Sequence, residues 1–156
     1  ALCKEAIERG AQETSRFTAL FDRQRLLWER VEVLARRERE ASVEVQLRQM
    51  RWRAEEELEE IKFELESAFS HAVAAYREAL QQDPHHADAL RALNELFWMR
   101  YEDAERRDDR DWMIYFESQL LEVADQETLN LLSAPSVISL SDQHEGSRLE
   151  VLALEW

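Results

Sequence analysis

The chain contains very few residues that interrupt helices or crosslink a fold. Its 156 residues include only two glycines, two prolines and one cysteine. So few turn-forming residues exclude a turn-rich β protein and favour long helices. The single Cys3 cannot form a disulfide within the chain, which fits a reducing compartment, so we expect a cytoplasmic location.

Positive charge and long apolar runs are also scarce. The formal net charge is -14, with 34 acidic against 20 basic residues. This balance excludes nucleic acid and anionic membrane surfaces as expected partners, because both attract clustered Lys and Arg. The sequence contains no run of about eighteen apolar residues, which is the length needed to span a bilayer. The first residues, "ALCKEAIERG", have neither an initiator Met nor a signal-peptide layout, so we expect a segment of a longer protein.

The sequence contains no recognisable catalytic constellation. Phosphoryl transfer by a protein kinase requires a glycine-rich loop, a strand lysine and metal-binding aspartates, which this chain does not supply. The His85-His86 pair is a poor zinc site, because adjacent histidines point apart. We therefore expect no enzyme activity, no cofactor and no metal.

The strongest positive signal is a seven-residue apolar repeat in the middle of the chain. Between Asp22 and Asp83 there is neither glycine nor proline, and two apolar series typical of a coiled-coil seam run through this stretch. The phase slips near residues 41–45, where a kink or a short break would account for it. We predict one very long helix, or two helices stacked end to end. The first series is Leu20, Leu27, Leu34 and Ala41; the second is Leu47, Ala54, Ile61, Ala68 and Ala75, joined by Leu58, Leu65, Ala72 and Ala79.

Shorter patterns complete the expected architecture. Helical stripes predict helices over residues 2–20, 86–107 and 110–124, the last capped by Asp108 or Asp109. Alternating residues near the C-terminus predict a β-hairpin, with strands at Val137–Leu140 and Leu149–Leu154 and Gly146 in the loop. The expected fold is mainly α, a long-helix coiled-coil-like hairpin or bundle with tetratricopeptide-like helix pairs. We expect a helical domain over 1–125, followed over 126–156 by a linker and the β-hairpin, the start of a truncated β domain.

One stretch, "AYREALQQDPHHADALRALNELF", resembles a tetratricopeptide repeat. Its small, aromatic, small and proline residues fall at the spacing of the second helix of that repeat, and apolar residues follow in the next helix. The resemblance implies that Tyr76 and Phe97 are buried between the helix ending at Pro84 and the helix after it. The residues that carry it are Ala72, Tyr76, Ala79, Pro84, Leu93 and Phe97.

A larger resemblance concerns the order of segments over about residues 20–156. "RQRLLWERVEVLAR", a long acidic helix, "YREALQQDPHHADALRAL" and "AERRDDRDWMIYFESQLLEVAD" resemble the helical region that follows the kinase domain in some multidomain bacterial serine/threonine protein kinases. In that family, a PEGA-like β domain and often a sulfatase-modifying-factor-like domain come next. The PEGA signature is represented here by "HEGSRLEV", which lacks its proline.

Two features indicate a surface for a protein partner. The run "EEELEEIKFELE" places like charges four residues apart, which mildly destabilises a helix and would be relieved by a basic partner; a solvated helix face is the alternative. Trp52 lies between arginines and off the apolar seam, so it is a candidate contact residue. Trp28, Trp98 and Trp112 are expected in the core. The candidate contact residues are Trp52, Glu55, Glu56, Glu59 and Glu60.

The sequence is compatible with two functions. The first is a non-catalytic interaction or spacer module, part of a bacterial serine/threonine kinase, that binds a protein partner or neighbouring domains of its own chain. The second is a structural coiled coil that dimerises the parent protein, in which case the chain would be a homodimer. The heptads favour the second function and the tetratricopeptide spacing favours the first.

Overall fold

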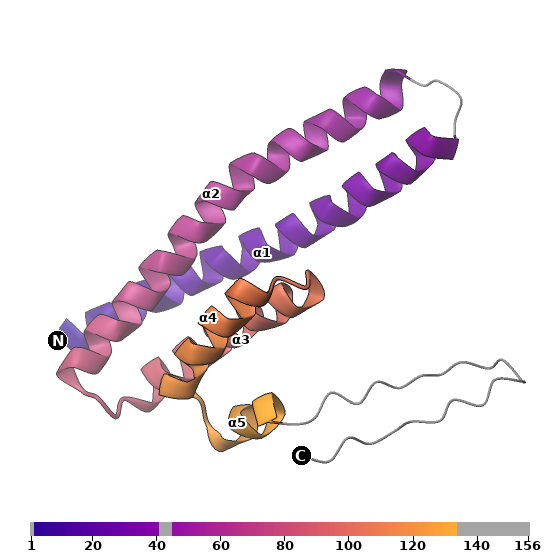
Figure 1. Ribbon diagram of the computed structural model, residues 1–156. Helices are drawn as coiled ribbons and strands as arrows, with labels where there is room; N and C mark the ends of the chain where they lie inside the picture. Colours follow the sequence, from indigo (N-terminus) through magenta and orange to yellow (C-terminus); the bar gives the residue numbers. More distant parts are fainter. Residues whose placement is uncertain (1, 41–44, 134–156) are drawn as a thin grey trace, which may run out of the picture.

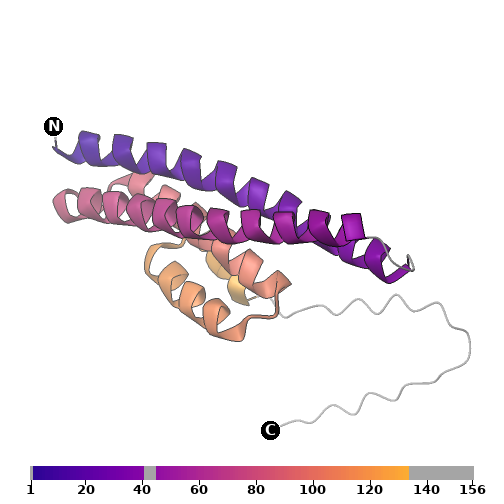
Figure 2. The same cartoon turned by 90° about the horizontal axis from the view of Figure 1, so that it is seen from above.

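The computed structural model describes residues 2–40 and 45–133, which form five α-helices and no strand. The first two helices are long and lie side by side as a hairpin, and α3 and α4 pack against one side of that hairpin (Figures 1 and 2). The mainly α fold is confirmed for these residues. The predicted β-hairpin lies wholly outside them, and of the predicted 126–156 unit only residues 126–133 are described, as a helix. The helices are α1 (Leu2–Glu40), α2 (Val45–Gln82), α3 (Ala87–Arg106), α4 (Arg110–Val123) and α5 (Gln126–Ser133).

The predicted apolar seams are the contact surface between α1 and α2. Leu27 and Leu34 from the first series are buried, as are Leu58 and Ile61 from the second. Helix is continuous over 45–80 as expected, and the predicted break falls between Glu40 and Val45. A single rod or an end-to-end stack is wrong, because either would leave both seams exposed. Folding back buries each seam against the other.

Ion pairs across the hairpin confirm that α1 and α2 are antiparallel. Arg9 near the start of α1 reaches Glu78 near the end of α2, with Nη2 and Oε2 2.5 Å apart. At the other end, Glu38 contacts Arg48. Residues far apart in sequence therefore lie side by side along the whole hairpin, as Figure 1 shows.

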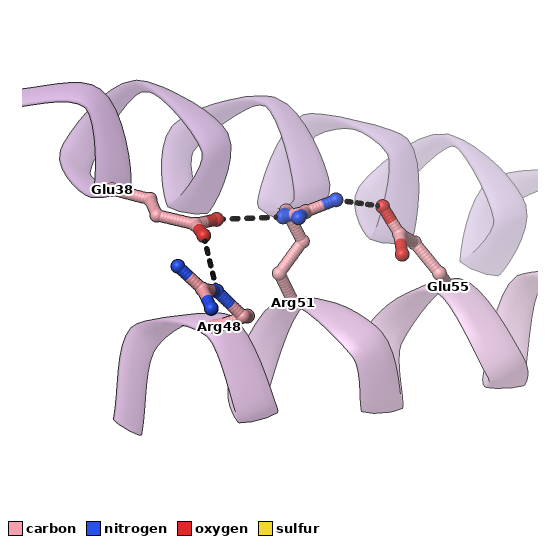
Figure 3. Close-up of polar contacts among 4 residues, drawn as sticks. All are labelled: Glu38, Arg48, Arg51 and Glu55. Carbon is pink, nitrogen blue, oxygen red and sulfur yellow. Dashed lines mark hydrogen bonds and ion pairs between the residues drawn. The ribbon is translucent and has the colours of Figure 1, made fainter. Parts of the chain in front are cut away.

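The end of the hairpin near residues 41–44 is held by a chain of charged groups (Figure 3). The Glu38 carboxylate accepts from Arg48 Nε at 3.0 Å and from Arg51 Nε at 2.9 Å, and Arg51 also donates to Glu55 at 2.7 Å. Hydrogen bonds from Arg48 and then Arg51 lower the pKa of Glu38, and those to Glu38 and Glu55 raise the pKa of Arg51. This chain of contacts bridges the last turn of α1 and the first turns of α2.

The end of α2 and the start of α4 follow local sequence signals. Helix α2 ends before Asp83-Pro84, and the Asp83 side chain accepts from the His85 backbone N–H at 3.2 Å. The Asp109 carboxylate accepts from the Trp112 backbone N–H and caps α4, so one of the two predicted caps is confirmed. Asp108 instead takes the left-handed conformation, with φ of 53°, that turns the chain between α3 and α4.

The main core lies where α3 and α4 meet the hairpin. The Phe69 ring of α2 stands edge-on to Phe97 of α3 and to Phe116 of α4, at centroid distances of 6.1 and 6.0 Å. It also contacts Phe17 of α1, 5.4 Å away. A single α2 side chain thus joins three other helices.

Tyr76 is buried, as the repeat spacing predicts, and it also makes contacts that the repeat spacing does not predict. It packs on α1: Thr14 Oγ1 lies 3.2 Å from its hydroxyl, and a Cβ on Gly10 would come within 2.7 Å of its ring. The preceding helix, rather than the following one, supplies these contacts. Phe97 is also buried, so that part of the prediction is confirmed.

Helix α5 is attached to α3 by one buried polar contact. Asn94 Nδ2 donates to Thr128 Oγ1 at 3.0 Å, and both residues are buried. Asn94 departs from the small residue of the repeat consensus, and this contact gives it a structural role. Hydrogen bonds from the Thr128 backbone amide and then its hydroxyl lower the pKa of Asp125, which precedes α5.

Candidate functional site

A groove lies between the hairpin and the α3–α4 pair. Its volume is about 500 Å³, and α1, α2, α3 and α4 all contribute to its walls. The floor contains the apolar side chains of Leu58, Ala104 and Phe116. We refer to this hollow as the tryptophan groove, because Trp28 and Trp112 both line it.

Both tryptophans are half-exposed rather than buried. Trp28 of α1 retains 45% of its surface and Trp112 of α4 retains 49%, so the prediction that they belong to the core is wrong. The reason is helical phase. Trp28 follows the buried seam residue Leu27 and is therefore turned about 100° away from it. Trp98, by contrast, is partly buried and stacks on Tyr101, with ring centroids 5.6 Å apart.

Arg107 fixes the Trp28 side of the groove. Its guanidinium lies 5.7 Å from the Trp28 ring centroid, and it pairs with Asp103 at 3.1 Å and donates to Gln24 at 3.5 Å. These contacts connect the end of α3 to the middle of α1. A second hollow of about 600 Å³ lies on the other side of this contact, and Trp28 and Arg107 line both hollows.

Arg100 fixes the floor of the groove. Its side chain is only 11% exposed and pairs with Glu66 of α2 at 2.6 Å. The guanidinium also lies over the Phe69 and Phe116 rings, 5.3 and 5.4 Å from their centroids. A cation held by two rings and a carboxylate orders the site before any partner arrives.

The charges around the groove are mixed. Lys62, Arg100 and Arg107 are interspersed with acidic groups, so the groove is suited to a ligand that carries charges of both signs beside apolar groups. A peptide segment has this character, whereas a polyanion does not. The acidic groups are Glu59, Glu66, Asp103 and Asp109.

The structure separates the five predicted contact residues into two groups. Glu59 lines the groove. Trp52, which is 54% exposed, is seven residues before Glu59 and therefore lies on the same face of α2, about 10 Å along the helix. Glu55 is partly buried and paired with Arg51, and Glu56 is exposed beside this stripe. Glu60 is turned toward the opposite flank of α2.

The repeat residues build the scaffold rather than a site. All of them except Pro84 are buried, and Pro84 is exposed in the turn between α2 and α3. The sequence missed Trp28, Trp112 and Arg107 as groove residues. Part of the signal was present, since Trp28 lies beside the seam and not on it. The contact between Arg107 and Trp28 joins residues too distant in sequence for any local pattern to reveal.

The described residues contain no cluster of three or more His, Cys, Asp or Glu side chains that could hold a metal ion. Among the same residues, no helix combines the length and apolarity needed to cross a membrane. No family model, no curated protein and no solved structure matches this chain. The tetratricopeptide and kinase-associated resemblances therefore stay predictions.

Proposed function

We propose that this chain is a non-catalytic interaction module that binds a peptide segment of a partner protein, or of a neighbouring domain, in the tryptophan groove. The observation that carries the proposal is the pair Trp28 and Trp112. These two half-exposed aromatic residues come from helices far apart in the chain and line the same groove. Aromatic side chains of this kind often supply much of the affinity of a protein interface.

The rigidity of the groove supports the same proposal. Arg100 and Arg107 are held by ion pairs and by aromatic rings, so little side-chain entropy would be lost when a partner binds. The partner segment contributes an apolar or aromatic anchor between the two tryptophans. Charged side chains of the partner meet Lys62 and Glu59 on the α2 wall and Asp103 and Arg107 on the α3 side.

We further propose that the module is a regulatory or spacer segment of a bacterial serine/threonine protein kinase. The order of segments along residues 20–156 supports this proposal, as does the tetratricopeptide spacing around Tyr76. The full reading frame of the gene tests it directly. A kinase domain upstream of this segment is the expected result, and an unrelated upstream domain would contradict it.

The alternative function, dimerisation of the parent through a coiled coil, has less support. The two apolar heptad series are the feature that favours dimerisation. Ten of their side chains are already buried within one chain, in its core or between α1 and α2. A seam covered within the chain is not available to a second chain. The ten residues are Leu27, Leu34, Ala54, Leu58, Ile61, Leu65, Ala68, Ala72, Ala75 and Ala79.

Selection of displayed random peptides by the purified protein tests the proposed function. We expect enrichment of peptides with an aromatic residue flanked by charges. The Trp28→Ala/Trp112→Ala double variant should bind the selected peptides about tenfold or more weakly, because both anchors are removed. Trp52→Ala should weaken only peptides long enough to extend past Glu59.

The matched control is Phe63→Ser, which removes an exposed aromatic residue of α2 that does not line the groove. This variant should bind as the parent protein does. Equal losses in the control and the groove variant would show that binding is non-specific. Undiminished binding by the Trp28→Ala/Trp112→Ala variant would place the site elsewhere and contradict the proposal.

A further inference from the structure

A line of arginines runs along α1 on the side facing away from the tryptophan groove. Arg9, Arg16, Arg23, Arg30 and Arg37 follow one another at intervals of seven residues, so they share one face of the helix. The first three form ion pairs with glutamates of α2. Arg9 pairs with Glu78 at 2.5 Å, Arg16 pairs with Glu64 at 3.5 Å, and Arg23 pairs with Glu57.

The supply of carboxylates on α2 ends before the line of arginines does. Glu64 and Glu57 are seven residues apart, and the next position in that series is Met50. Arg30 and Arg37 are exposed, and neither forms an ion pair with any other residue that the structure describes. Arg53, on the same side of α2, adds a further positive charge in place of a negative one.

Apolar side chains lie between these arginines. Leu26 is 60% exposed and Val33 is 45% exposed, and helical phase places both on the same flank of α1 as Arg30 and Arg37. Met50 of α2 is exposed beside them. We call the set of Leu26, Arg30, Val33, Arg37 and Met50 the arginine flank.

The arginine flank and the tryptophan groove lie on different sides of the hairpin. The groove is lined by Glu59, Lys62 and Glu66, whereas Glu57 and Glu64, which pair with the arginine line, are on the other flank of α2. Helices α3 and α4 cover only one side of the hairpin (Figure 2). The two surfaces can therefore be tested separately.

We propose that the arginine flank binds an acidic, amphipathic helix of a partner protein. The partner carries two carboxylates seven residues apart, about 10 Å along its helix, which pair with Arg30 and Arg37. An aliphatic residue between those carboxylates covers Val33, and another, one turn beyond the carboxylate that pairs with Arg30, covers Leu26. The three ion pairs between α1 and α2 show how such contacts are made. The partner's carboxylates would pair with Arg30 and Arg37 in the way that α2 glutamates pair with the three preceding arginines.

The chemistry of the flank favours a protein helix over other anions. The apolar side chains Leu26, Val33 and Met50 would lie unused against a phosphate backbone, which offers no apolar surface. A regular spacing of seven residues matches the repeat of a helix that packs side by side with α1. Apolar contact combined with paired charges is what such a helix offers.

Binding of a synthetic peptide to the full chain tests this proposal. The probe is a labelled helical peptide of about twenty residues, long enough to hold its helix, with glutamate at every seventh position, leucine four residues after each glutamate, and alanine and glutamine elsewhere. Fluorescence anisotropy should show binding that weakens as salt is raised. Arg30→Glu/Arg37→Glu should reduce affinity by about tenfold or more, and a peptide with lysine in place of glutamate should recover binding to that variant.

The matched control is Arg36→Glu/Arg39→Glu, which reverses two charges at the same end of α1 on other faces of the helix. The proposal expects a much smaller loss for this control. It is overturned if the peptide fails to bind, if the control loses as much as the flank variant, or if the charge swap gives no recovery. It is equally overturned if a single-stranded oligonucleotide or phosphatidylserine vesicles bind the flank more tightly than the peptide, or if sedimentation shows that a second copy occupies it. Failure here would leave the tryptophan groove unaffected, because Trp28 and Trp112 are unchanged.

Discussion

Gly10 is buried within α1, and the ring of Tyr76 occupies the space where a Cβ on Gly10 would lie. In an exposed helix, a glycine costs about 1 kcal/mol relative to alanine. Here the absence of a side chain allows the aromatic ring to approach α1, since a Cβ would come within 2.7 Å of a ring carbon. The packing of Tyr76 thus explains why a glycine, which has low helix propensity, occupies position 10 of α1.

Replacing Gly10 with alanine should therefore destabilise the protein, despite the better helix propensity of alanine. Overpacking in a core costs about 1–3 kcal/mol, which exceeds the propensity gain. A urea denaturation curve measures the change in the free energy of unfolding. In a Tyr76→Leu background, the same alanine should be neutral or stabilising. A Gly10→Ala protein that is more stable with Tyr76 in place would refute this contact.

The Glu38 carboxylate should titrate below its usual range because hydrogen bonds from Arg48 and Arg51 stabilise its charged form. A depressed folded-state pKa contributes stability that is present above the unfolded pKa and is lost as pH falls through the folded value. NMR titration of the Glu38 carboxyl carbon measures it directly. The pKa should rise in an Arg48→Ala/Arg51→Ala variant. An unchanged pKa would mean that the contacts in Figure 3 do not persist in solution.

At the scale of elements, the end of α2 and the starts of α4 and α5 each have an identifiable local cause. Asp109 caps α4, Asp83-Pro84 ends α2, and Asp125 accepts the Thr128 amide at the start of α5. Such signals are local in sequence, which is why the helices over 86–107 and 110–124 could be predicted almost to the residue. The end of α2 could be predicted for the same reason.

Helix α5 should lose stability in acid. Its cap, Asp125, has a lowered pKa caused first by the Thr128 backbone amide, so the stabilisation is present above the unfolded pKa and disappears as pH falls through the folded pKa. The protection factor of the Thr128 amide, which is its intrinsic exchange rate divided by the observed rate, should fall over that range. Asp125→Asn, which keeps the cap but cannot titrate, should abolish the pH dependence. A variant with the same acid response as the parent would show that another group is responsible.

The pairing of elements was harder to predict than the elements themselves. Heptads identify a stripe that must be buried, and the stripe at Leu58 and Ile61 is indeed buried. They do not say whether its partner is another chain, an end-to-end neighbour or a helix folded back. The deciding contacts, such as that between Arg9 and Glu78, join residues that no local pattern connects.

At the scale of the whole molecule, two packing units create features that neither has alone. The hairpin supplies Trp28, the α3–α4 pair supplies Trp112, and Arg107, Arg100 and the aromatic core around Phe69 join the two units. The sequence singles out Trp52 and Glu59 as candidate contact residues, and of these Glu59 lines the groove. Sequence reasoning misassigned Trp28 and Trp112 to the core, since an aromatic residue at a rim and one in a core differ only in tertiary context.

The central claim is that α1 and α2 of one chain cover each other, so the seam is closed and the groove is left for a partner. Crosslinking tests it with one mass measurement. In a Cys3→Ser background, the pair Arg9→Cys/Glu78→Cys places thiols where two side chains now meet, and a short bis-maleimide can join them. We predict a crosslinked product with the mass of one chain, about 18.5 kDa, at every protein concentration. A product of twice that mass would show that the seam joins two chains, and would contradict the account.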